Sequence, residues 1–472
     1  MKPVRAFLFL LSVLSILFLV SFYRSKRNQE YLHAPNPPIP EQTKPRELAI
    51  PLENLSGLSE SDHDSLPQED TVRKFTPDTV LLAETTILPE GNTDSRLLFA
   101  PNDTIGLRNL ALQLQTASFN KSQLRIFYYG DSQIEGDQIT SAMRKKLQER
   151  YGGRGPGLIV PDQFYNPPHQ LMMTRSDNWQ FPTLKEMSGQ NKSILFHNAL
   201  AIDTAETAWF RINRLRFLDP QEDYNQIQVF FESSDSVLIE CFQSAEPIYR
   251  AQVMTGDRTQ NMKLKFDQTP EDLKITYTCR DSLWVSGLSL ESESGIFVDN
   301  IALRGLSYPP FSSSGTANLK EMINELQPAM FIIHFGVNVV PYFSESYTAF
   351  RHQFARQIKR IRELSPQAPI LIIGVSDMSH RVNGNMESYA NIHQIKQIQY
   401  SLAMENGCLF WDLESFMGGP GSMIRWVESN PPLGRKDYIH FAAAGATKIG
   451  EELAKLLIEQ FDPQQQTAWK SN

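Results

Sequence analysis

The hydrophobic positions of this 472-residue chain form two alternating kinds of segment. Short, near-continuous apolar runs are typical of strands buried on both faces of a parallel sheet. Four such runs cover 124–129, 330–335, 370–375 and 408–413. Between them, apolar residues recur at spacings of three and four, as on one face of a helix; the clearest sets are Phe350, Phe354, Ile358, Ile361 and Leu364, and Ile449, Leu453, Leu456 and Leu457. This alternation predicts an α/β fold with a doubly wound parallel sheet and right-handed crossovers.

The pattern changes between residues 186 and 299, where apolar and polar positions alternate with a period of two. Several short strands at this spacing, separated by turn residues, predict a β-sandwich. We therefore expect an inserted β-sandwich domain at 186–299, within a discontinuous α/β domain that covers 101–185 and 300–465. Cys241 and Cys279 lie in the insert, as a disulfide or as two free buried thiols. The aromatic residues of the insert suit a sugar-binding platform or the core of the sandwich.

The N-terminus has a third pattern. Residues 6–23 carry no charge and are flanked by basic residues on both sides. About 18 apolar residues is the lower limit for a helix that spans a bilayer. A cleaved signal peptide would show a shorter apolar core and an A-x-A-like site, and none precedes Arg24. We expect residues 1–27 to be an uncleaved signal-anchor; the alternatives are a cleaved signal peptide and, less simply, a buried soluble helix.

The segment that follows, residues 28–100, is expected to be a disordered, proline-rich tether, with nine prolines between Arg27 and Arg96. A polar segment of this kind buries too little apolar surface to offset the entropy of ordering it.

The net charge of −8, with no basic run beyond the extreme N-terminus, argues against a nucleic-acid partner, because phosphate binding requires a cationic face. The sequence has no CxxC pair and no metal-ligand spacing of histidines, so we expect no metal and no cofactor.

Candidate chemistry begins where the first apolar strand ends, at Gly130-Asp131-Ser132. The next helix is expected to start after an N-cap at Asp137 and to end at Gly152. Ser132 then lies between the carboxyl end of a strand and a helix, where ligands bind in open α/β sheets. Taken alone, Ser132 fits a helix-capping serine as well as a nucleophile. In the second case Gly130 leaves room at the turn and Asp131 supports it.

A serine nucleophile requires a base, and the base requires an acid that orients it. Asp437 and His440 stand three residues apart, immediately before the last helical pattern. This spacing can bring the carboxylate to Nδ1 of the imidazole and leave Nε2 free to face the serine. For this pair alone, a surface turn is the simpler explanation.

Acyl chemistry also requires hydrogen-bond donors for a developing oxyanion. Asn338 follows an apolar strand and Gly336, which allows a close backbone approach, and its side chain can donate an N–H. The backbone N–H groups of Gly305, at the end of another apolar run, and of Ser132 are the other candidates. Each of these positions also fits an ordinary turn at the end of a strand.

Considered together, the blocks Gly-Asp-Ser, Gly, Gly-x-Asn and Asp-x-x-His resemble, in content and order, the four blocks of the SGNH (GDSL-type) hydrolase superfamily. The resemblance covers about 105–165 and 300–460, and the absence of a G-x-S-x-G elbow disfavours the α/β-hydrolase fold. It implies a flavodoxin-like doubly wound sheet. It also implies a role for each candidate: Ser132 as nucleophile, His440 as base, Asp437 as its orienter, and Gly305, Asn338 and the Ser132 backbone as the oxyanion hole.

Finer features resemble a periplasmic branch of that superfamily, which includes peptidoglycan O-acetylesterases with an inserted β-domain. They are "YGGRGPGLI" at 151–159 and "FWDLESFMGGPGSMIRW" at 410–426. This implies an esterase that removes acyl groups, foremost acetyl, from an acylated envelope glycan outside the cytoplasm, held at the membrane through residues 6–23. Two residues depart from the family: Gln133 replaces the usual Leu or His, and Val339 stands where many envelope esterases have Glu.

Two other functions remain open. The same residues would serve an O-acyltransferase to a glycan hydroxyl, with a membrane acyltransferase as partner. A non-catalytic, glycan-binding envelope protein is the second, and the intact Ser132, Asn338 and His440 argue against it. Trp411 and Trp426 suit sugar stacking or core packing, and His334 is expected to be a core histidine.

Overall fold

The computed structural model describes residues 88, 95–100, 105–120, 122–159, 171–182, 195–196, 199–201, 207–214, 223–256, 259–313 and 316–461. The expected signal-anchor at 1–27, with its apolar stretch at 6–23, and most of the tether expected at 28–100 lie outside these residues. None of the described helices is both long and apolar enough to cross a membrane.

The first sheet has six strands in the order β1-β19-β16-β15-β2-β14. They are β1 (Leu97–Phe99), β2 (Gln123–Gly130), β14 (Gly295–Ala302), β15 (Pro328–His334), β16 (Ile370–Ile373) and β19 (Leu409–Trp411). All neighbours pair in parallel except β1, which pairs antiparallel with β19. Along the chain, the five parallel strands follow the flavodoxin-like order 2-1-3-4-5. This confirms the doubly wound parallel sheet, and its order reverses between β2 and β15.

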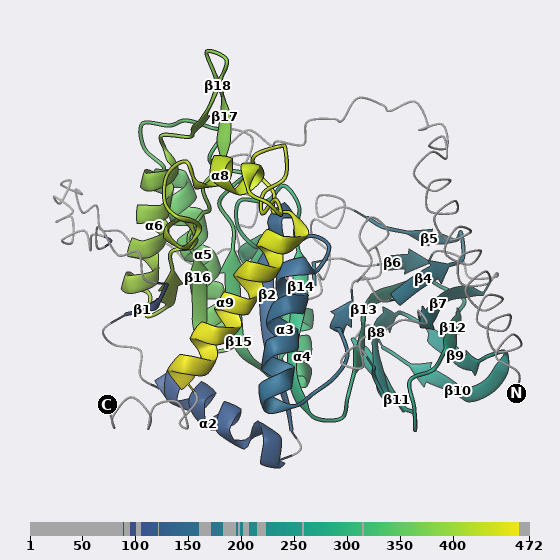
Figure 1. The fold of residues 1–472 in the computed structure, drawn as a ribbon. Coiled ribbons are helices and arrows are strands. Elements are labelled where there is room, and N and C mark those ends of the chain that lie inside the picture. The colour runs from purple at the N-terminus through teal and green to yellow at the C-terminus, as the bar shows by residue number, and fades with distance from the viewer. Residues whose placement is uncertain are drawn as a thin grey trace, which may run out of the picture. The chain divides into compact units, whose positions relative to one another are not determined.

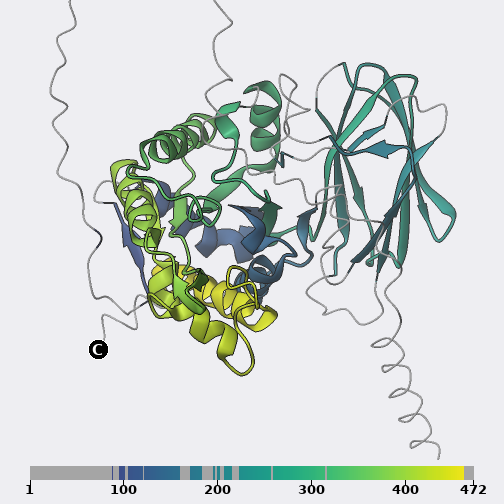
Figure 2. The same cartoon turned by 90° about the horizontal axis from the view of Figure 1, so that it is seen from above.

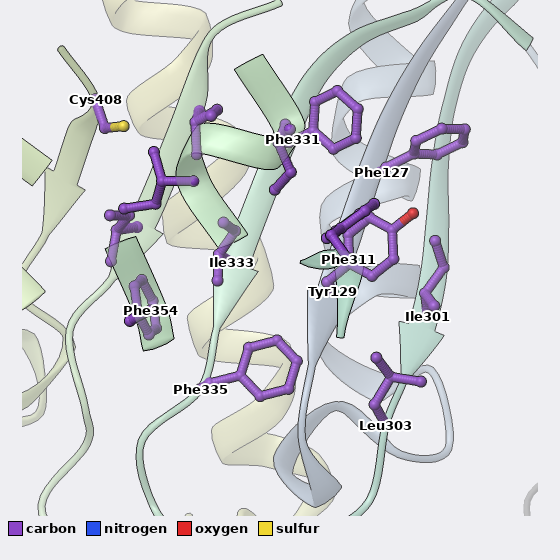
Figure 3. Packing of buried hydrophobic residues seen from close by; sticks show 14 of the residues in the cluster. Phe127, Tyr129, Ile301, Leu303, Phe311, Phe331, Ile333, Phe335, Phe354 and Cys408 are labelled. Carbon is purple, nitrogen blue, oxygen red and sulfur yellow. The ribbon is translucent and has the colours of Figure 1, made fainter. Parts of the chain in front are cut away.

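Helices cover both faces of this sheet, as Figures 1 and 2 show. One face packs against α2 (Ile105–Asn120), α3 (Gln138–Tyr151) and α9 (Ala443–Phe461), the other against α4 (Thr316–Leu326), α5 (Thr348–Leu364) and α6 (Ile392–Glu405). Because successive strand residues point to opposite faces, Tyr128 packs with the first group of helices and Phe127 and Tyr129 with the second. In Figure 3, Tyr129 lies against Phe311, which belongs to the short turn η4 (Phe311–Ser313). Burial on both faces explains why these strands are apolar throughout.

Before β14 the chain forms two antiparallel sheets, ordered β10-β9-β12-β7-β4 and β11-β8-β13-β6-β5, with β3 paired to β13. Residues of both sheets, among them Phe210 and Ile275 of one and Val229 and Val285 of the other, share one hydrophobic core. The two sheets therefore form a β-sandwich, as the period of two predicted. The strands are β3 (Gly157–Ile159), β4 (Leu171–Arg175), β5 (Trp179–Gln180), β6 (Ala199–Ala201), β7 (Ala208–Arg214), β8 (Gln226–Ser233), β9 (Ser236–Gln243), β10 (Glu246–Met254), β11 (Gln260–Lys265), β12 (Asp272–Thr278) and β13 (Leu283–Glu291).

The elements differ from the expected bounds at three places. β3, β4 and β5 pair with strands of the sandwich, although all three precede residue 186. β14 begins before residue 300 and belongs to the parallel sheet. β1 lies within the segment expected to be a tether up to residue 100. It is ordered because Leu97–Phe99 pairs along its whole length with β19 at the edge of the sheet.

Helix α3 starts after Asp137 and ends at Gly152, as expected, but the Asp137 side chain does not cap it. The carboxylate of Asp137 lies 2.8 and 2.9 Å from the two terminal nitrogens of Arg144 and accepts a hydrogen bond from Thr140. Arg144 is buried, and a buried charge needs a partner. The ion pair therefore takes the carboxylate that would otherwise cap the helix.

The structure resolves two alternatives left open by the sequence and agrees with the expectation for His334. Cys241 and Cys279 are buried thiols and form no disulfide. Trp411 and Trp426 are 1 % and 5 % exposed, so they are core residues and do not present a face to a sugar. His334 is buried, and its Nδ1 lies 3.0 Å from the hydroxyl of Tyr128. Burial lowers the pKa of its imidazole to about 3, so it is neutral in the core.

A buried charged cluster joins the parallel sheet to the sandwich. Arg125 of β2 binds both carboxylate oxygens of Asp299 on β14, at 3.0 and 2.9 Å, and also reaches Glu291 and Ser289 on β13. The other oxygen of Glu291 accepts hydrogen bonds from the amides of Gln123 and Gln226 at 2.8 and 2.9 Å. The guanidinium and both carboxylates are thus paired, which a charge at this depth requires.

Candidate active site

Ser132 lies at the carboxyl end of β2, next to the point where the strand order reverses. It opens the single turn η2 (Ser132–Ile134), and Asp131 caps this turn by accepting a hydrogen bond from the Gln133 N–H at 3.0 Å. The Asp131 N–H donates to the carbonyl of His334 at the end of β15, at 3.2 Å. Two neighbouring strands and one carboxylate thus hold the backbone of Ser132, at the sheet edge where open α/β proteins bind ligands.

Gly130 is required by close packing at this strand end. A Cβ there would lie 2.8 Å from the side chain of Ile134 and 3.0 Å from the carbonyl of His334. Gly336, at the end of β15, is required by its backbone, with a φ of 141° and no space for a Cβ beside Val375. Both glycines therefore let the loops of β2 and β15 approach their neighbours closely.

His440 lies in a turn before α9 that is built around Asp437. Oδ1 of Asp437 accepts hydrogen bonds from the backbone N–H groups of Ile439 and His440, both at 3.0 Å. Tyr438, inside this turn, has a φ of 60°, a left-handed conformation that is strained for a bulky residue. The Tyr438 carbonyl accepts from the N–H of Ser379, at 3.1 Å, where the hairpin of β17 (Ser379–Val382) and β18 (Asn385–Ser388) begins.

The two turns meet in a hydrogen-bonded chain of three side chains. Oγ of Ser132 lies 2.8 Å from Nε2 of His440, and Nδ1 of His440 lies 2.8 Å from Oδ2 of Asp437. A carboxylate can only accept, so the network assigns the imidazole proton to Nδ1 and leaves Nε2 to accept from the serine. This arrangement can deprotonate the hydroxyl as it attacks a carbonyl.

Asp437 is held in its charged form. Partial burial works against ionisation, but the hydrogen bonds from the His440 ring and from the backbone of the turn outweigh it. They lower the pKa of the Asp437 carboxyl to about 2. Asp437 therefore stays ionised wherever His440 could act as a base.

Asp131 has the opposite environment, since it is fully buried. Burial raises the pKa of its carboxyl to about 7, against the opposing effect of the Gln133 N–H and of the nearby His440 ring. Asp131 contacts the turn and not the base, which agrees with the supporting role expected from the sequence.

The expected oxyanion donors lie on the loops around Ser132. Nδ2 of Asn338 donates to the carbonyl of Leu306 at 2.9 Å, which ties the loop of Asn338 to the one that carries Gly305. An amide nitrogen has two hydrogens, so this bond leaves one. Gly305 is exposed, with a φ of 79°. Within the described part of the chain, neither its N–H nor that of Ser132 donates to any acceptor. Three donors are therefore available on Ser132 and on the loops beside it.

Gln133 is a site residue whose role the sequence did not reveal. Its side chain is buried, and its Nε2 lies 2.8 Å from Oγ of Ser376, after β16, and 2.9 Å from the carbonyl of Ile439. A polar residue directly after the serine, where a leucine is usual, was the only signal in the sequence. The contact with Ile439 connects the turn of Ser132 to the turn of His440.

The loop that carries Asn338 goes on to two exposed aromatic residues, Tyr342 and Phe343, which are 44 % and 75 % exposed. The hydroxyl of Tyr347 anchors this loop by donating to the carbonyl of Tyr342 at 3.4 Å. Asn391 at the start of α6 donates to that hydroxyl at 2.7 Å and to the carbonyl of Val340 at 2.8 Å. The loop thus presents two aromatic rings to solvent from an anchored base.

Within the residues that the structure describes, no three His, Cys, Asp or Glu side chains are grouped as metal ligands would be.

No protein-family model and no curated protein matches the sequence. Among solved structures, a peptidoglycan O-acetylesterase matches over 77 % of this chain and 99 % of its own, with 19 % identity and a TM-score of 0.62. The chain therefore has the fold of that esterase, which agrees with the fold that the sequence resemblance implied.

Two other matches have TM-scores too low to carry an argument. A family two carbohydrate esterase from Clostridium thermocellum matches over 61 % of this chain and 98 % of its own, with 10 % identity and a TM-score of 0.24. The carbohydrate-binding module CsCBM6-3 from Clostridium stercorarium matches over 29 % of this chain and 95 % of its own, with 12 % identity and a TM-score of 0.20.

Proposed function

We propose that this protein is a serine esterase of the SGNH type that removes O-acyl groups, foremost acetyl, from a cell-envelope glycan such as peptidoglycan. The observation that carries the proposal is the hydrogen-bonded chain from Ser132 through His440 to Asp437. It stands at the ligand-binding edge of the sheet, with hydrogen-bond donors on the loops beside it.

In the proposed reaction, Oγ of Ser132 attacks the ester carbonyl while Nε2 of His440 takes its proton. The carbonyl oxygen becomes an oxyanion, stabilised by the N–H groups of Ser132 and Gly305 and the free amide hydrogen of Asn338. His440 then gives its proton to the departing glycan oxygen, and an acyl-serine remains. Water attacks the acyl-serine, His440 takes the proton of the water, and the proton returns to Oγ as acetate leaves. The charge of Asp437 stabilises the imidazolium in both halves.

A glycan substrate is supported by the fold, which is shared with a peptidoglycan O-acetylesterase, and by the aromatic loop beside the site. Tyr342 and Phe343 follow the oxyanion residue Asn338 by a few positions and are open to solvent. Aromatic rings present a large, rigid apolar face at low entropic cost, which suits the flat faces of sugar rings. In the proposed complex, the aromatic loop receives the glycan while the ester enters between Ser132 and Asn338.

We also propose that the enzyme works outside the cytoplasm, held at the membrane by residues 6–23 with the following proline-rich segment as a spacer. This rests on the apolar N-terminal run and its basic flanks.

The test is acetate release from O-acetylated peptidoglycan by the full-length chain, compared with Ser132→Ala and with Ser141→Ala as a matched control. Among the described residues, the Ser141 hydroxyl bonds only to the carbonyl of Gln138 in α3. We expect Ser132→Ala to lose at least about 10³-fold of the rate, as loss of a nucleophile does, and Ser141→Ala to keep it. Equal release by all three proteins contradicts the mechanism. Transfer of acetyl to an added glycan acceptor in place of water would assign an acyltransferase instead.

A further inference from the structure

Gln133 lies where three loops of the site meet. Its backbone N–H is bound by Asp131 in the nucleophile turn, and its side-chain nitrogen reaches Ser376 and the carbonyl of Ile439. Ile439 immediately precedes His440. The side chain is only 6 % exposed, so these contacts are shielded from water. One residue therefore contacts the turn of the nucleophile, the loop after β16 and the turn of the base.

We propose that Gln133 is a positioning residue, which fixes the turn of His440 against the turn of Ser132 through the carbonyl of Ile439. The inference rests on the proposed function, because it assigns a role in the same site. A hydrogen bond between Ser132 and His440 requires that both turns keep one relative position. The Nε2 of Gln133 links them next to that bond, at 2.9 Å from the Ile439 carbonyl.

The chemistry of the contact requires an amide. Nε2 has two hydrogens, and both are used, one for the hydroxyl of Ser376 and one for the carbonyl of Ile439. Leucine has no donor and would leave this carbonyl without its partner. Glutamate has the same size, but its ionised carboxylate cannot donate a hydrogen bond. It would place an oxygen against the carbonyl oxygen of Ile439, and the two would repel each other. Glutamine is therefore the fitting residue for this contact.

The turn of His440 is held by hydrogen bonds that do not involve Gln133. Its own hydrogen bonds include those to Oδ1 of Asp437, the 2.8 Å bond from the Arg435 N–H to the His440 carbonyl, and the 3.1 Å bond from Ser379 to Tyr438. Loss of the Gln133 amide should therefore leave the turn folded but free to shift relative to Ser132. A shift of this kind affects catalysis more than folding.

The test compares Gln133→Met with Gln148→Met. Gln148 is also a buried glutamine, and its Nε2 donates to two backbone carbonyls, those of Gly155 and Ile296, at 3.2 and 3.0 Å. Ile296 lies near the start of β14, beside the start of β2, whereas Ser132 follows the end of β2. Methionine keeps the length of the side chain and removes its donors. Both variants should lose similar stability, but only the contact of Gln133 with Ile439 lies next to His440.

We expect Gln133→Met to lower kcat for an aryl acetate about 10- to 100-fold with KM nearly unchanged, as misplacement of a catalytic group does. Gln133→Glu should lose a similar factor, and Gln148→Met should keep the kcat of the wild type. Wild-type kcat in Gln133→Met overturns the inference. An equal loss of kcat in Gln148→Met also overturns it, because the effect would then come from stability alone.

A second measurement separates this inference from the proposed function. The proton on Nδ1 of His440, between the imidazole and Asp437, gives a low-field proton resonance that needs no substrate. We expect this resonance to broaden or exchange faster in Gln133→Met and to be unchanged in Gln148→Met. An unchanged resonance in both variants contradicts the positioning role. A wild-type protein that shows the resonance but hydrolyses no ester contradicts the proposed function and leaves this comparison in force.

Discussion

Oγ of Ser132 lies 2.8 Å from Nε2 of His440, although 308 residues of chain separate the two. Each residue is held in a turn of the same design. Asp131 accepts from the backbone N–H two residues ahead of it, at Gln133, and Asp437 accepts from the N–H two residues ahead of it, at Ile439. The carboxylate of Asp131 is buried and that of Asp437 is partly exposed. We therefore expect a substitution of Asp437 to affect catalysis and one of Asp131 to affect the pH dependence of stability.

Replacing Asp437 by Asn should disable the base without unfolding the protein. An amide can donate to Nδ1, which would favour the imidazole tautomer with its proton on Nε2, and Nε2 could then no longer accept from Ser132. We expect kcat to fall about 10³- to 10⁴-fold, as in serine hydrolases that lose this carboxylate. Steady-state kinetics with an aryl acetate measure the loss. The melting temperature serves as the control and should change little, because the Asp437 side chain is 43 % exposed. A kcat within tenfold of the wild type would argue against an orienting role.

Replacing Asp131 by Asn should change the pH dependence of stability. The pKa of Asp131 is raised from 3.8 to about 7 in the folded protein, so the fold holds a proton that the unfolded chain releases between these values. The contribution of this group to stability therefore falls as the pH rises from about 4 to 7. Asparagine cannot ionise and keeps the oxygen that accepts from Gln133.

The measurement is urea unfolding of wild type and Asp131→Asn at pH 5 and pH 8. The variant should gain stability relative to the wild type at the higher pH, by at most about 3 kcal/mol, since about two pH units separate pH 5 from the raised pKa and each unit corresponds to about 1.4 kcal/mol. A difference between the two proteins that does not change with pH would contradict the raised pKa.

Replacing Arg125 by Met should destabilise the fold strongly. The change leaves the carboxylates of Glu291 and Asp299 buried without their cation. Breaking a buried ion pair by removing one partner costs about 3–5 kcal/mol. The matched control is Arg211→Met, which breaks the pair of Arg211 with Asp272 on the exposed face of the sandwich. We expect this control to cost less than about 1 kcal/mol. Urea unfolding measures the free energy of unfolding of both variants. Equal losses would show that the buried ion pairs of Arg125 stabilise the fold no more than the exposed pair of Arg211 does.

Replacing Phe343 by Ala should weaken the binding of a polymeric substrate and spare a small one. Loss of one aromatic contact costs about 0.5–1.5 kcal/mol, which corresponds to a factor of about 2 to 12 in affinity. We expect KM for O-acetylated glycan to rise by that factor, with kcat for an aryl acetate unchanged. Leu112→Ala is the control, since Leu112 is also exposed, at 58 %, but lies on α2. Equal effects of the two variants on KM would mean that the aromatic loop does not receive the glycan.

The parallel sheet and its order could be predicted because its strands are buried on both faces. A run such as Leu124–Tyr129 has no polar alternation, and each of the expected donors and acids follows such a run or precedes a helix. Parallel strands place their carboxyl ends at one edge, so the blocks at Ser132, Gly305, Asn338 and His440 were expected to meet there. The bond between Ser132 and His440 agrees with that expectation.

Other features depend on contacts that no local pattern shows. β1 is ordered because it pairs with β19, which lies more than 300 residues further along the chain. The carboxylate of Asp137 pairs with the buried Arg144 and does not cap the helix, because a buried charge needs a partner. Gln133 appeared only as a departure from a family pattern, since its partner Ile439 is remote in sequence. Each of these is decided by tertiary packing.

β2 and β14 pair side by side, with the whole sandwich between them in the chain. During synthesis, β2 therefore leaves the ribosome long before β14 and β15, the strands that pair with it, whereas the strands β6 to β13 follow one another and share a core of their own. Because domains tend to fold as units in the order of synthesis, we expect the sandwich to form first and the parallel sheet to close around it afterwards. The turn of His440 is synthesised after every strand of the sheet. A chain caught partway through its synthesis should thus hold a finished sandwich while Ser132 still lacks its contact with His440. Under the proposed function, hydrolysis can begin only when the whole fold is complete.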